Sequence, residues 1–282
     1  MDKPPDLTSH DVVQRVRRSL GIRAAGHTGT LDPFATGLLV VLVGRATRLA
    51  RFIEGQPKTY LATARLGVRT DTDDLTGRVI ETSETAGVVD VNRVRQILDG
   101  FAGTRLQRPP QYSAKHVDGE RSYQRARRGE SVQLAEVSVT VHRIELLECR
   151  PPLVTFRAVV GAGTYLRALA RDLGEQLDVG AHLTSLRRES IGSLRVDDAI
   201  PLDRLGPEAV LPALDVLRDL PVIELDQAAR AAVLHGRAVA DSGAAGQQGS
   251  GPVALVAGDE LVAVARREDG LLYPTVVLAV SA

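Results

Sequence analysis

The sequence predicts a layered fold of the α+β or α/β class, followed by a small β-rich module. Segments with strand and helix patterns alternate over the first 200 residues, which is typical of layered folds. Short strand-like segments separated by turn residues then fill the region after residue 220. No glycine fingerprint for a dinucleotide follows any of the predicted strands.

The first predicted element is a helix that begins at Thr8-Ser9 and ends at Gly21. Its apolar residues recur at helical spacing, at Val12, Val13, Val16 and Leu20. Apolar runs, alternation and glycine stops predict the elements that follow: a buried strand at Leu38–Val43, a helix at Ala46–Glu54 closed by Gly55, a strand at Lys58–Leu66, and a helix at residues 91–101.

The segment Arg105–Gly129 differs from its surroundings because it is basic, contains Pro109-Pro110 and shows little periodicity. Long connections of this kind in compact domains usually bind something, so we expect a functional loop with a short helix at Ser122–Arg128. The elements predicted after it are strands at Val132–Leu147 and Val154–Val160, an amphipathic helix at Thr164–Leu177 and a shorter helix at Ala181–Arg188.

A domain boundary is predicted near residue 220, where weakly patterned, proline-containing sequence leads into Pro221. We therefore expect a large domain at residues 1–220 and a small one at residues 221–282. Short strands are predicted around 222–225, 253–257, 260–266 and 271–280, with a glycine-rich loop at 242–251.

The charge of the chain is unevenly distributed although its sum is zero. Residues 1–200 carry 29 Lys and Arg against 24 Asp and Glu, and residues 201–282 carry 6 against 11. Residues 101–130 carry seven Lys and Arg against three Asp and Glu. A local basic surface is typical of phosphate binding, although ordinary solvated faces show such a surplus too.

The composition excludes several classes of protein. No apolar run approaches the roughly 18 residues that a membrane span requires. The single cysteine, Cys149, excludes an internal disulfide and a thiolate metal cluster. Because the first residues contain no basic-then-apolar leader, we expect a cytoplasmic protein.

Several familiar catalytic motifs are missing as well. The chain contains no Gly-x-Ser-x-Gly elbow, no Walker loop and no paired-cysteine zinc signature, and its six histidines never stand at ligand spacing. Asp71-Thr72-Asp73-Asp74 lacks the downstream ligands of a calcium loop, so a solvated or hydrogen-bonded turn is expected there.

The segment Gly26–Gly37 is the strongest candidate for chemistry. It gathers glycines, threonines, His27 and Asp32 just before a predicted buried strand. Glycines allow close approach to a ligand, and Pro33 restricts the conformation of Asp32. A tight turn with capping hydroxyls is the ordinary structural alternative.

Three further segments accompany it, each with an ordinary alternative. Lys58-Thr59-Tyr60 places an aromatic hydroxyl at the start of a strand, where a half-buried sheet residue is common. Gly161–Arg167 is a glycine turn that enters a helix carrying Tyr165 and Arg167. Gln107–Gly119 is a rigid basic segment that could also be a linker.

The order and spacing of these segments resemble the TruB family of tRNA pseudouridine synthases across residues 2–195. The resemblance rests on five segments: Asp2-Lys3-Pro4 with Thr8-Ser9; Gly26–Gly37; Lys58-Thr59-Tyr60 with Leu66-Gly67 and Thr70–Asp73; Gln107–Gly119; and Gly163–Arg188. It implies an α+β pseudouridine synthase fold with a mixed, mostly antiparallel central sheet. Residues 221–282 resemble, less specifically, the small PUA-type RNA-binding module of many members.

The resemblance also implies a role for each matching residue. Asp32 corresponds to the catalytic aspartate and nucleophile, Arg167 to the arginine that pairs with it, and Tyr60 to the tyrosine that stacks on the target base and handles a proton. The other positions implied to bind substrate are Tyr165 and Leu186 in the uridine pocket, His27 at the target loop, Lys3 and Pro4 in the floor of the site, and Lys115 in the RNA-binding loop.

The implied reaction is the conversion of uridine to pseudouridine at position 55 in the T-loop of tRNA. It requires an anionic group, a dry pocket and loss of the C5 proton, but no metal or redox cofactor. Asp32 could attack C1′, attack C6 or promote a glycal. The alternatives are the same chemistry on another RNA, or a protein that folds or binds the T-arm without essential catalysis.

The partner expected is the T-arm of tRNA, with no membrane and no obligatory protein partner. A short chain without basic tails favours a stand-alone monomer over the relatives that depend on guide RNA. The chain departs from the family pattern at Ser113-Ala114-Lys115-His116, where either Lys115 or His116 takes the place of the usual lysine. It also has Gly161-Ala162 where Cys or Ser is frequent.

Overall fold

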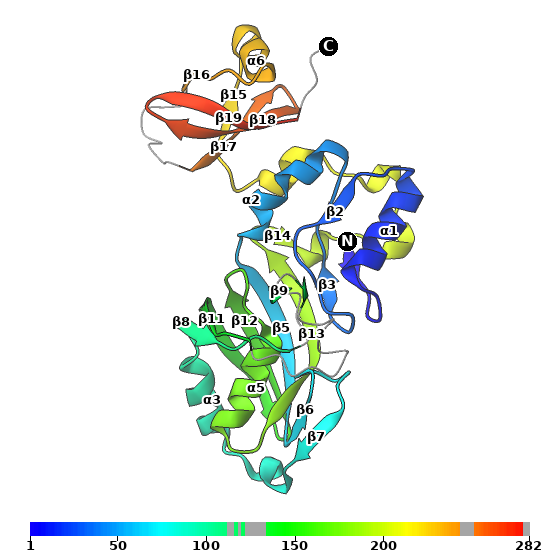
Figure 1. Ribbon diagram of the computed structural model, residues 1–282, viewed down its shortest axis with the longest axis vertical. Helices are drawn as coiled ribbons and strands as arrows, with labels where there is room; N and C mark the ends of the chain where they lie inside the picture. The colour runs from blue at the N-terminus through cyan, green and yellow to red at the C-terminus, as the bar shows by residue number, and fades with distance from the viewer. Residues whose placement is uncertain (112–115, 118–119, 122–133, 243–250, 279–282) are drawn as a thin grey trace.

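The computed structural model describes residues 1–111, 116–117, 120–121, 134–242 and 251–278 (Figure 1). Its main feature is an eight-stranded sheet in the order β1-β3-β13-β5-β12-β11-β8, with β14 paired to β13. All pairs are antiparallel except β3 with β13. The expected α+β class with a mixed, mostly antiparallel sheet is confirmed. The strands are β1 (Asp2–Lys3), β3 (Thr36–Leu38), β5 (Lys58–Leu66), β8 (Gly103–Gln107), β11 (Val137–Arg150), β12 (Leu153–Val160), β13 (Ala181–Ile191) and β14 (Leu194–Arg195).

Two helices pack together over this sheet. α3 (Val91–Asp99) contacts β11, and α5 (Leu166–Gln176) contacts β13 and β5. Their apolar residues join those of the strands in one core that includes Phe101, Phe156, Leu169 and Leu183. Both helices and the strand at Lys58–Leu66 were predicted from the periodicity of apolar residues.

The N-terminal helix α1 (Ser9–Leu20) begins with a capping box, in which Thr8 and Asp11 exchange hydrogen bonds, and ends at Gly21 in the left-handed region. It packs on β2 (Ala25–His27). β2 in turn pairs with β4 (Val41–Val43). The helix therefore fixes the strand that leads into the Gly26–Gly37 segment.

The prediction of one strand at Leu38–Val43 was wrong. The chain leaves the central sheet after Leu38 and forms β4 with a different partner, β2. Leu38, Leu39 and Val40 are all buried, so the apolar run is continuous although the backbone changes partners within it. The helix predicted at Ala46–Glu54 begins as a 3-10 turn, η1 (Gly44–Leu49), and continues as α2 (Ala50–Glu54), which ends at Gly55.

The prediction of a helix at Ala181–Arg188 was also wrong, because this segment is the central strand β13. β13 pairs with β5, with register shifts between Leu183 and Ser185 and between Arg188 and Ser190. A bulge adds one residue and interrupts the alternation of faces. Buried Leu183 and Leu186 are thus three residues apart, which mimics helical spacing.

The remaining described elements flank the sheet. β6 (Val68–Thr70) and β7 (Val79–Thr82) form a hairpin, and η2 (Glu84–Val88) follows it. Within the predicted loop, β8 extends to Gln107, and β9 (His116–Val117) pairs with β10 (Glu120–Arg121). The helix predicted at Ser122–Arg128 lies outside the described residues. Short 3-10 turns lead from β14 to the C-terminal sheet: η3 (Val196–Asp198), η4 (Leu202–Arg204), η5 (Pro207–Ala209) and η6 (Ala213–Leu217).

A second sheet occupies the C-terminal part of the chain, in the order β15-β17-β18-β19-β16. Its elements are β15 (Val222–Glu224), α6 (Gln227–Leu234), β16 (Val239–Ala240), β17 (Pro252–Ala257), β18 (Glu260–Glu268) and β19 (Leu271–Val277). The four predicted strands are present, whereas α6 and β16 were not predicted. The glycine-rich segment at 242–251 lies mostly outside the described residues.

A shared hydrophobic cluster joins the two sheets. Leu42, Leu49 and Ile53 pack in one cluster with Val264 and Val276 of the C-terminal sheet. Along the same seam, three arginines donate hydrogen bonds to carbonyl oxygens near the end of the chain: Arg45 to Leu278 at 3.1 Å, Arg48 to Val277 at 2.7 Å and Arg51 to Thr275 at 3.1 Å. No helix within the described residues has the length and apolar character needed to cross a membrane.

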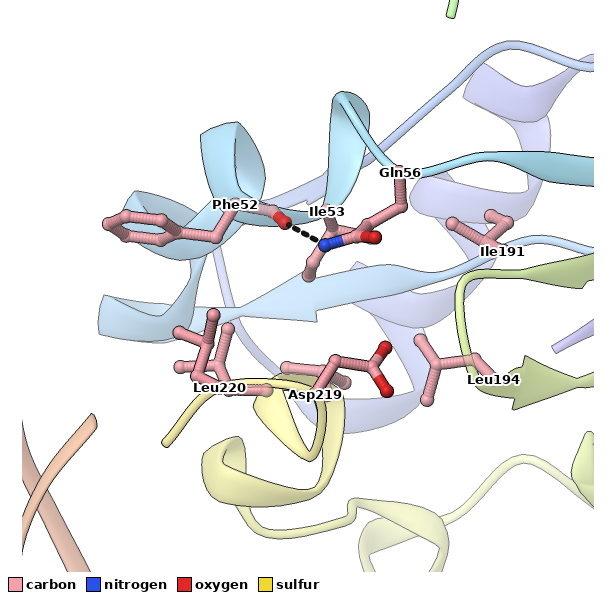
Figure 2. A pocket seen from close by; sticks show the side chains of 9 residues that line it. Phe52, Ile53, Gln56, Ile191, Leu194, Asp219 and Leu220 are labelled. Carbon is pink, nitrogen blue, oxygen red and sulfur yellow. Dashed lines mark hydrogen bonds between the residues drawn. The ribbon is translucent and has the colours of Figure 1, made fainter. Parts of the chain in front are cut away.

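A small pocket lies beside this seam, between α2, the β13–β14 turn and η6 (Figure 2). Its lining is mostly apolar, with Gln56 and Asp219 as the polar side chains. Gln56 is tied to the backbone oxygen of Phe52 at 3.4 Å, and Asp219 accepts a hydrogen bond from the Ser193 amide at 3.2 Å.

We predict that Gly37→Ala disrupts the contact between β3 and β13. Gly37 has φ +100°, and an added Cβ would overlap the backbone nitrogen and oxygen of Arg188, which cannot move without breaking the sheet. The free energy of unfolding, measured by chemical denaturation, should fall by about 3 kcal/mol or more. Gly55→Ala is the matched control, since Gly55 has φ −76° and open space around it. Equal losses in both variants would contradict the close approach of the two strands.

Candidate active site

Asp32 lies in the loop between β2 and β3, and the backbone on both sides of it is fixed. The Leu31 amide donates to Ser9 Oγ at 2.9 Å, and this hydroxyl also contacts the Leu31 oxygen at 3.3 Å. On the other side, Lys3 Nζ donates to the Pro33 oxygen at 3.0 Å. The Ala35 amide closes a turn on the Asp32 oxygen at 3.1 Å, with proline at the second position, where turns favour it. The carboxylate is therefore presented on a rigid loop.

Arg167 connects this loop to helix α5. Its Nη2 donates to Asp32 Oδ1 at 3.0 Å, and its Nη1 donates to Asp74 Oδ2 at 3.3 Å and to the Thr72 oxygen at 3.1 Å. Only 5% of Arg167 is exposed to solvent. One buried guanidinium is thus shared between two carboxylates, an arrangement that its planar fork of donors allows.

Asp74 belongs to a tight turn after β6 that Thr72 and Thr76 hold in place. Its Oδ1 accepts hydrogen bonds from the Thr76 amide at 2.9 Å, the Thr76 hydroxyl at 2.6 Å and the Thr72 hydroxyl at 2.8 Å. The turn is also anchored to β13, because the Leu183 amide donates to the Asp73 oxygen at 3.0 Å. Of the two alternatives expected for Asp71–Asp74, the hydrogen-bonded turn is the one formed.

The electrostatics of Asp32 reflect two opposing effects. Burial raises the pKa of the Asp32 carboxyl, while the Arg167 guanidinium beside it favours the ionised form; Asp74 raises the pKa further and Lys3 lowers it. The side chain keeps 28% of its surface exposed. Within the described part of the chain, Oδ2 accepts no hydrogen bond from protein groups, so this oxygen is open to a bound molecule.

Tyr60 and Leu186 lie on the neighbouring strands β5 and β13, in the same core cluster as Leu31. Behind Tyr60 stands Arg188, which is 1% exposed. Its three nitrogens donate to the Leu38 oxygen at 2.7 Å, the Gly29 oxygen at 3.0 Å and the Tyr60 hydroxyl at 3.4 Å. A single side chain therefore ties the Asp32 loop, β3 and the tyrosine together.

Two buried lysines complete the base of the site. Lys3 donates to three carbonyl oxygens, of Pro4, Leu7 and Pro33, and Lys58 donates to those of Glu54 and Gln56. Burial lowers the pKa of each ammonium to about 8, with Arg188 adding to the effect. Burial, followed by Arg188, also lowers the pKa of His27, which favours neutral imidazole at neutral pH.

A second polar network holds the start of α5. Gln107 bonds through both ends of its side-chain amide to the backbone of Tyr165, at 2.9 and 3.1 Å. One helical turn beyond Arg167, Arg171 pairs with Asp73 at 3.0 Å and donates to the Arg108 oxygen at 2.9 Å. The beginning of the predicted RNA-binding loop is thus attached to the helix that carries Arg167.

The structure brings most of the predicted site residues together. Arg167 is in direct contact with Asp32, and Lys3 is joined to the same loop through the Pro33 oxygen. Tyr60 and Leu186 occupy the adjacent strands β5 and β13. The Pro4 oxygen accepts a hydrogen bond from Lys3. His27 is half-buried and its Nδ1 lies 3.4 Å from the Gly29 amide, within the loop itself. Lys115 lies outside the described residues.

Four residues that contribute to the site were not identified as site residues from the sequence: Ser9, Asp74, Gln107 and Arg188. Each stands inside or beside a segment that carried the resemblance, and that placement was the available signal. Their contacts join segments far apart in the chain, so sequence patterns could not reveal them. Within the described residues, no three His, Cys, Asp or Glu side chains gather as a metal site would require.

Comparison with known proteins gives consistent matches. The sequence profile described as "TruB family pseudouridylate synthase (N terminal domain)" matches residues 17–166. The tRNA pseudouridine synthase B of Thermobifida fusca (strain YX) is 44% identical over 290 residues, covering 99% of this chain and 97% of that protein. The protein of the same name from Aquifex aeolicus (strain VF5) is 41% identical over 246 residues, covering 85% of each. Among solved structures, a chain of an H/ACA RNP bound to a substrate RNA containing 2′-deoxyuridine matches with a TM-score of 0.74 and 27% identity, covering 99% of this chain and 83% of that one.

We predict a pH-dependent stability that originates in Lys58. Its pKa is about 8 in the folded protein and about 10.5 when unfolded, so between these values the unfolded chain binds more protons and stability rises with pH. From pH 8 to pH 10, the wild type should gain about 2 kcal/mol relative to Lys58→Met in urea unfolding. Identical pH profiles for the two proteins would show that Lys58 stays protonated.

Proposed function

The chain belongs to the TruB family of pseudouridylate synthases, and we propose that it converts uridine to pseudouridine in tRNA, at position 55 of the T-loop. Two relatives that are 41% and 44% identical to it over the aligned residues carry the name tRNA pseudouridine synthase B. The observation that carries the proposal is the buried Arg167 guanidinium between Asp32 and Asp74, with Asp32 Oδ2 left open.

The reaction is an isomerisation, so its atoms balance within the nucleotide. The N1–C1′ bond breaks, the base turns and a bond forms between C5 and C1′. C5 then loses its proton, and N1 gains one. The protein has to hold the detached base, supply an anionic group at the ribose or the ring, and move one proton.

We assign the anionic role to Asp32. The hydrogen bond from Arg167 fixes Oδ1 and leaves Oδ2 for the target nucleotide, and the positive charge favours the ionised carboxylate. We assign Asp74 a positioning role, because it holds the other nitrogen of Arg167 and is only 3% exposed.

We assign binding of the flipped base to Tyr60, Leu186 and Tyr165. An enzyme that acts on a base takes it out of the stack into a pocket and holds it against aromatic and apolar side chains. Tyr60 additionally receives a hydrogen bond from Arg188, which sets the direction of its hydroxyl for handling the C5 proton. We assign contacts with the substrate RNA to His27 and Lys115, and we assign Lys3 and Pro4 to the floor of the active site.

The proposal divides the chain into a catalytic part at residues 1–220 and a PUA-like RNA-binding module at residues 221–282. The shared cluster and the three arginine contacts between them support one continuous RNA-binding surface. We further propose that the protein acts as a monomer on tRNA in the cytoplasm, without an obligatory protein partner.

The T-arm assay for this function measures tritium release from C5-labelled uridine in a T-arm RNA. Wild type should release tritium at position 55, and Asp32→Ala should lower the rate by at least about 10³-fold while RNA affinity is retained. RNA binding without any turnover by the wild type would instead support a protein that only folds or holds the T-arm. Activity that survives in Asp32→Ala would refute the role of Asp32.

Asp74→Asn separates positioning from chemistry in the same assay. The amide keeps the shape of Asp74 but removes one of the two charges that hold Arg167, so kcat should fall by about 10- to 100-fold with the RNA Kd nearly unchanged. Asp71→Asn is the matched control, since Asp71 lies in the same turn and has no bond to Arg167 among those described. Equal effects of the two substitutions would contradict the proposed function of Asp74.

We predict that Arg45 and Arg48, which bond to the end of the C-terminal sheet, contribute to the salt dependence of RNA affinity. Arg45 and Arg48 are exposed, and no carboxylate of the described residues forms an ion pair with them, so their remaining donors suit phosphates. Arg45→Gln with Arg48→Gln should reduce the slope of log K against log salt for full-length tRNA by about 1 to 2, without changing kcat. Arg143→Gln with Arg150→Gln, on β11, should leave the slope unchanged. If both double variants show the same slope as the wild type, Arg45 and Arg48 do not contact the RNA.

A further inference from the structure

We propose that Gln107 is a positioning residue for the reaction: its side-chain amide holds the backbone of Tyr165, and thereby sets where Tyr165 and Arg167 face the target nucleotide. This inference rests on the proposed function, because it names a further residue on which that reaction depends. Gln107 is almost fully buried, and its side-chain hydrogen bonds within the described residues run to Tyr165 rather than to Asp32, so it acts through Tyr165 and Arg167.

The contact consists of two hydrogen bonds between one side-chain amide and the backbone of one residue. Gln107 Oε1 accepts from the Tyr165 amide at 2.9 Å, and Gln107 Nε2 donates to the Tyr165 oxygen at 3.1 Å. The residue is 1% exposed. A primary amide has one acceptor and two donors, so Gln107 offers Tyr165 the same pair of bonds that a neighbouring strand would offer.

The turn that leads into α5 is rich in glycine. The preceding turn is Gly161-Ala162-Gly163, and Gly163 has φ +84°, so the backbone there has wide conformational freedom. Tyr165 is the N-cap of the helix, and its own side chain makes no capping bond. The first amides of a helix lack intrahelical acceptors. Gln107, which lies 58 residues earlier in the chain, supplies the acceptor for the Tyr165 amide.

The position of Gln107 links this constraint to the rest of the site. It is the last residue of β8, which pairs with β11 in the central sheet, so the amide projects from a fixed strand. The next residue, Arg108, accepts a hydrogen bond from Arg171 on the same helix. Arg167 lies between Tyr165 and Arg171, and its 3.0 Å bond to Asp32 leaves little room for a shift of the helix end.

The charge of the neighbourhood favours glutamine over an ionisable residue. Arg105 on β8 already pairs with Asp172 on α5 at 3.0 Å, and Arg171 pairs with Asp73. A neutral amide joins the strand to the helix without disturbing these pairs. It also bonds to the N–H and the C=O of Tyr165 at once, which a carboxylate or an apolar residue cannot do.

The experiment compares Gln107→Met with wild type in the tritium-release assay and in RNA binding. Methionine keeps the length and volume of the side chain but forms neither bond. We expect kcat to fall by about 10- to 100-fold, with the RNA Kd within about twofold of wild type. Gln96→Met on α3 is the matched control, since Gln96 is exposed and should leave both values unchanged.

A second measurement keeps the test independent of catalysis. Hydrogen exchange of the Tyr165 amide should be protected in wild type and become fast in Gln107→Met, while amides of the central strands stay protected. Gln107→Glu keeps the acceptor and loses the donor, so its kcat should lie between those of wild type and Gln107→Met. Two results would overturn the inference. One is a kcat of Gln107→Met within twofold of wild type. The other is an RNA Kd that rises by the same factor as kcat falls. Absence of turnover in wild type would instead refute the proposed function, while the exchange data would still report on the contact itself.

Discussion

A buried guanidinium requires compensation for the hydration it loses, and the arrangement of Arg167 follows from that requirement. Asp32 and Asp74 lie in different loops, and Arg167 lies on a helix that begins more than 90 residues after either of them. Pairing one cation with two anions ties these three segments to one another. The loop carrying Asp32, the turn carrying Asp74 and the start of α5 can therefore be described as one electrostatic unit that rests on β13.

The cations beneath this unit are stabilised differently. Lys3, Lys58 and Arg188 are all buried, and within the described residues their hydrogen bonds run to carbonyl oxygens and to the Tyr60 hydroxyl rather than to carboxylates. Carbonyl oxygens satisfy the donors but leave the positive charge in place. The base of the site is consequently both rigid and electropositive, which suits the ionised aspartate that we propose and a substrate that carries phosphates.

The two segments whose secondary structure was wrongly predicted share a physical feature. At Leu38–Val43 and at Ala181–Arg188 the residues are buried on all sides or interrupted by bulges, so burial no longer alternates with the period of the element. In contrast, the residues of α1, α3, α5 and β5 differ in burial between one face and the other. The spacing of their apolar residues therefore follows the period of a helix or a strand, and these elements were predicted. Short elements such as β16 and the bonds made by Ser9, Gln107 and Arg188 depend on partners distant in the chain, which local patterns do not encode.

The sequence by itself determined the fold class, the family and the identity of the central carboxylate, because caps, apolar periods and the ordered segments around Asp32, Tyr60 and Arg167 are local properties of the chain. The tertiary structure alone decided which residues hold that carboxylate in place. Asp74 joins Arg167, Ser9 fixes Leu31 and Gln107 fixes Tyr165 only after the sheet has brought the segments together. The sequence specifies which residue types the proposed site contains, whereas long-range packing and the need to satisfy buried charges and backbone groups set their geometry.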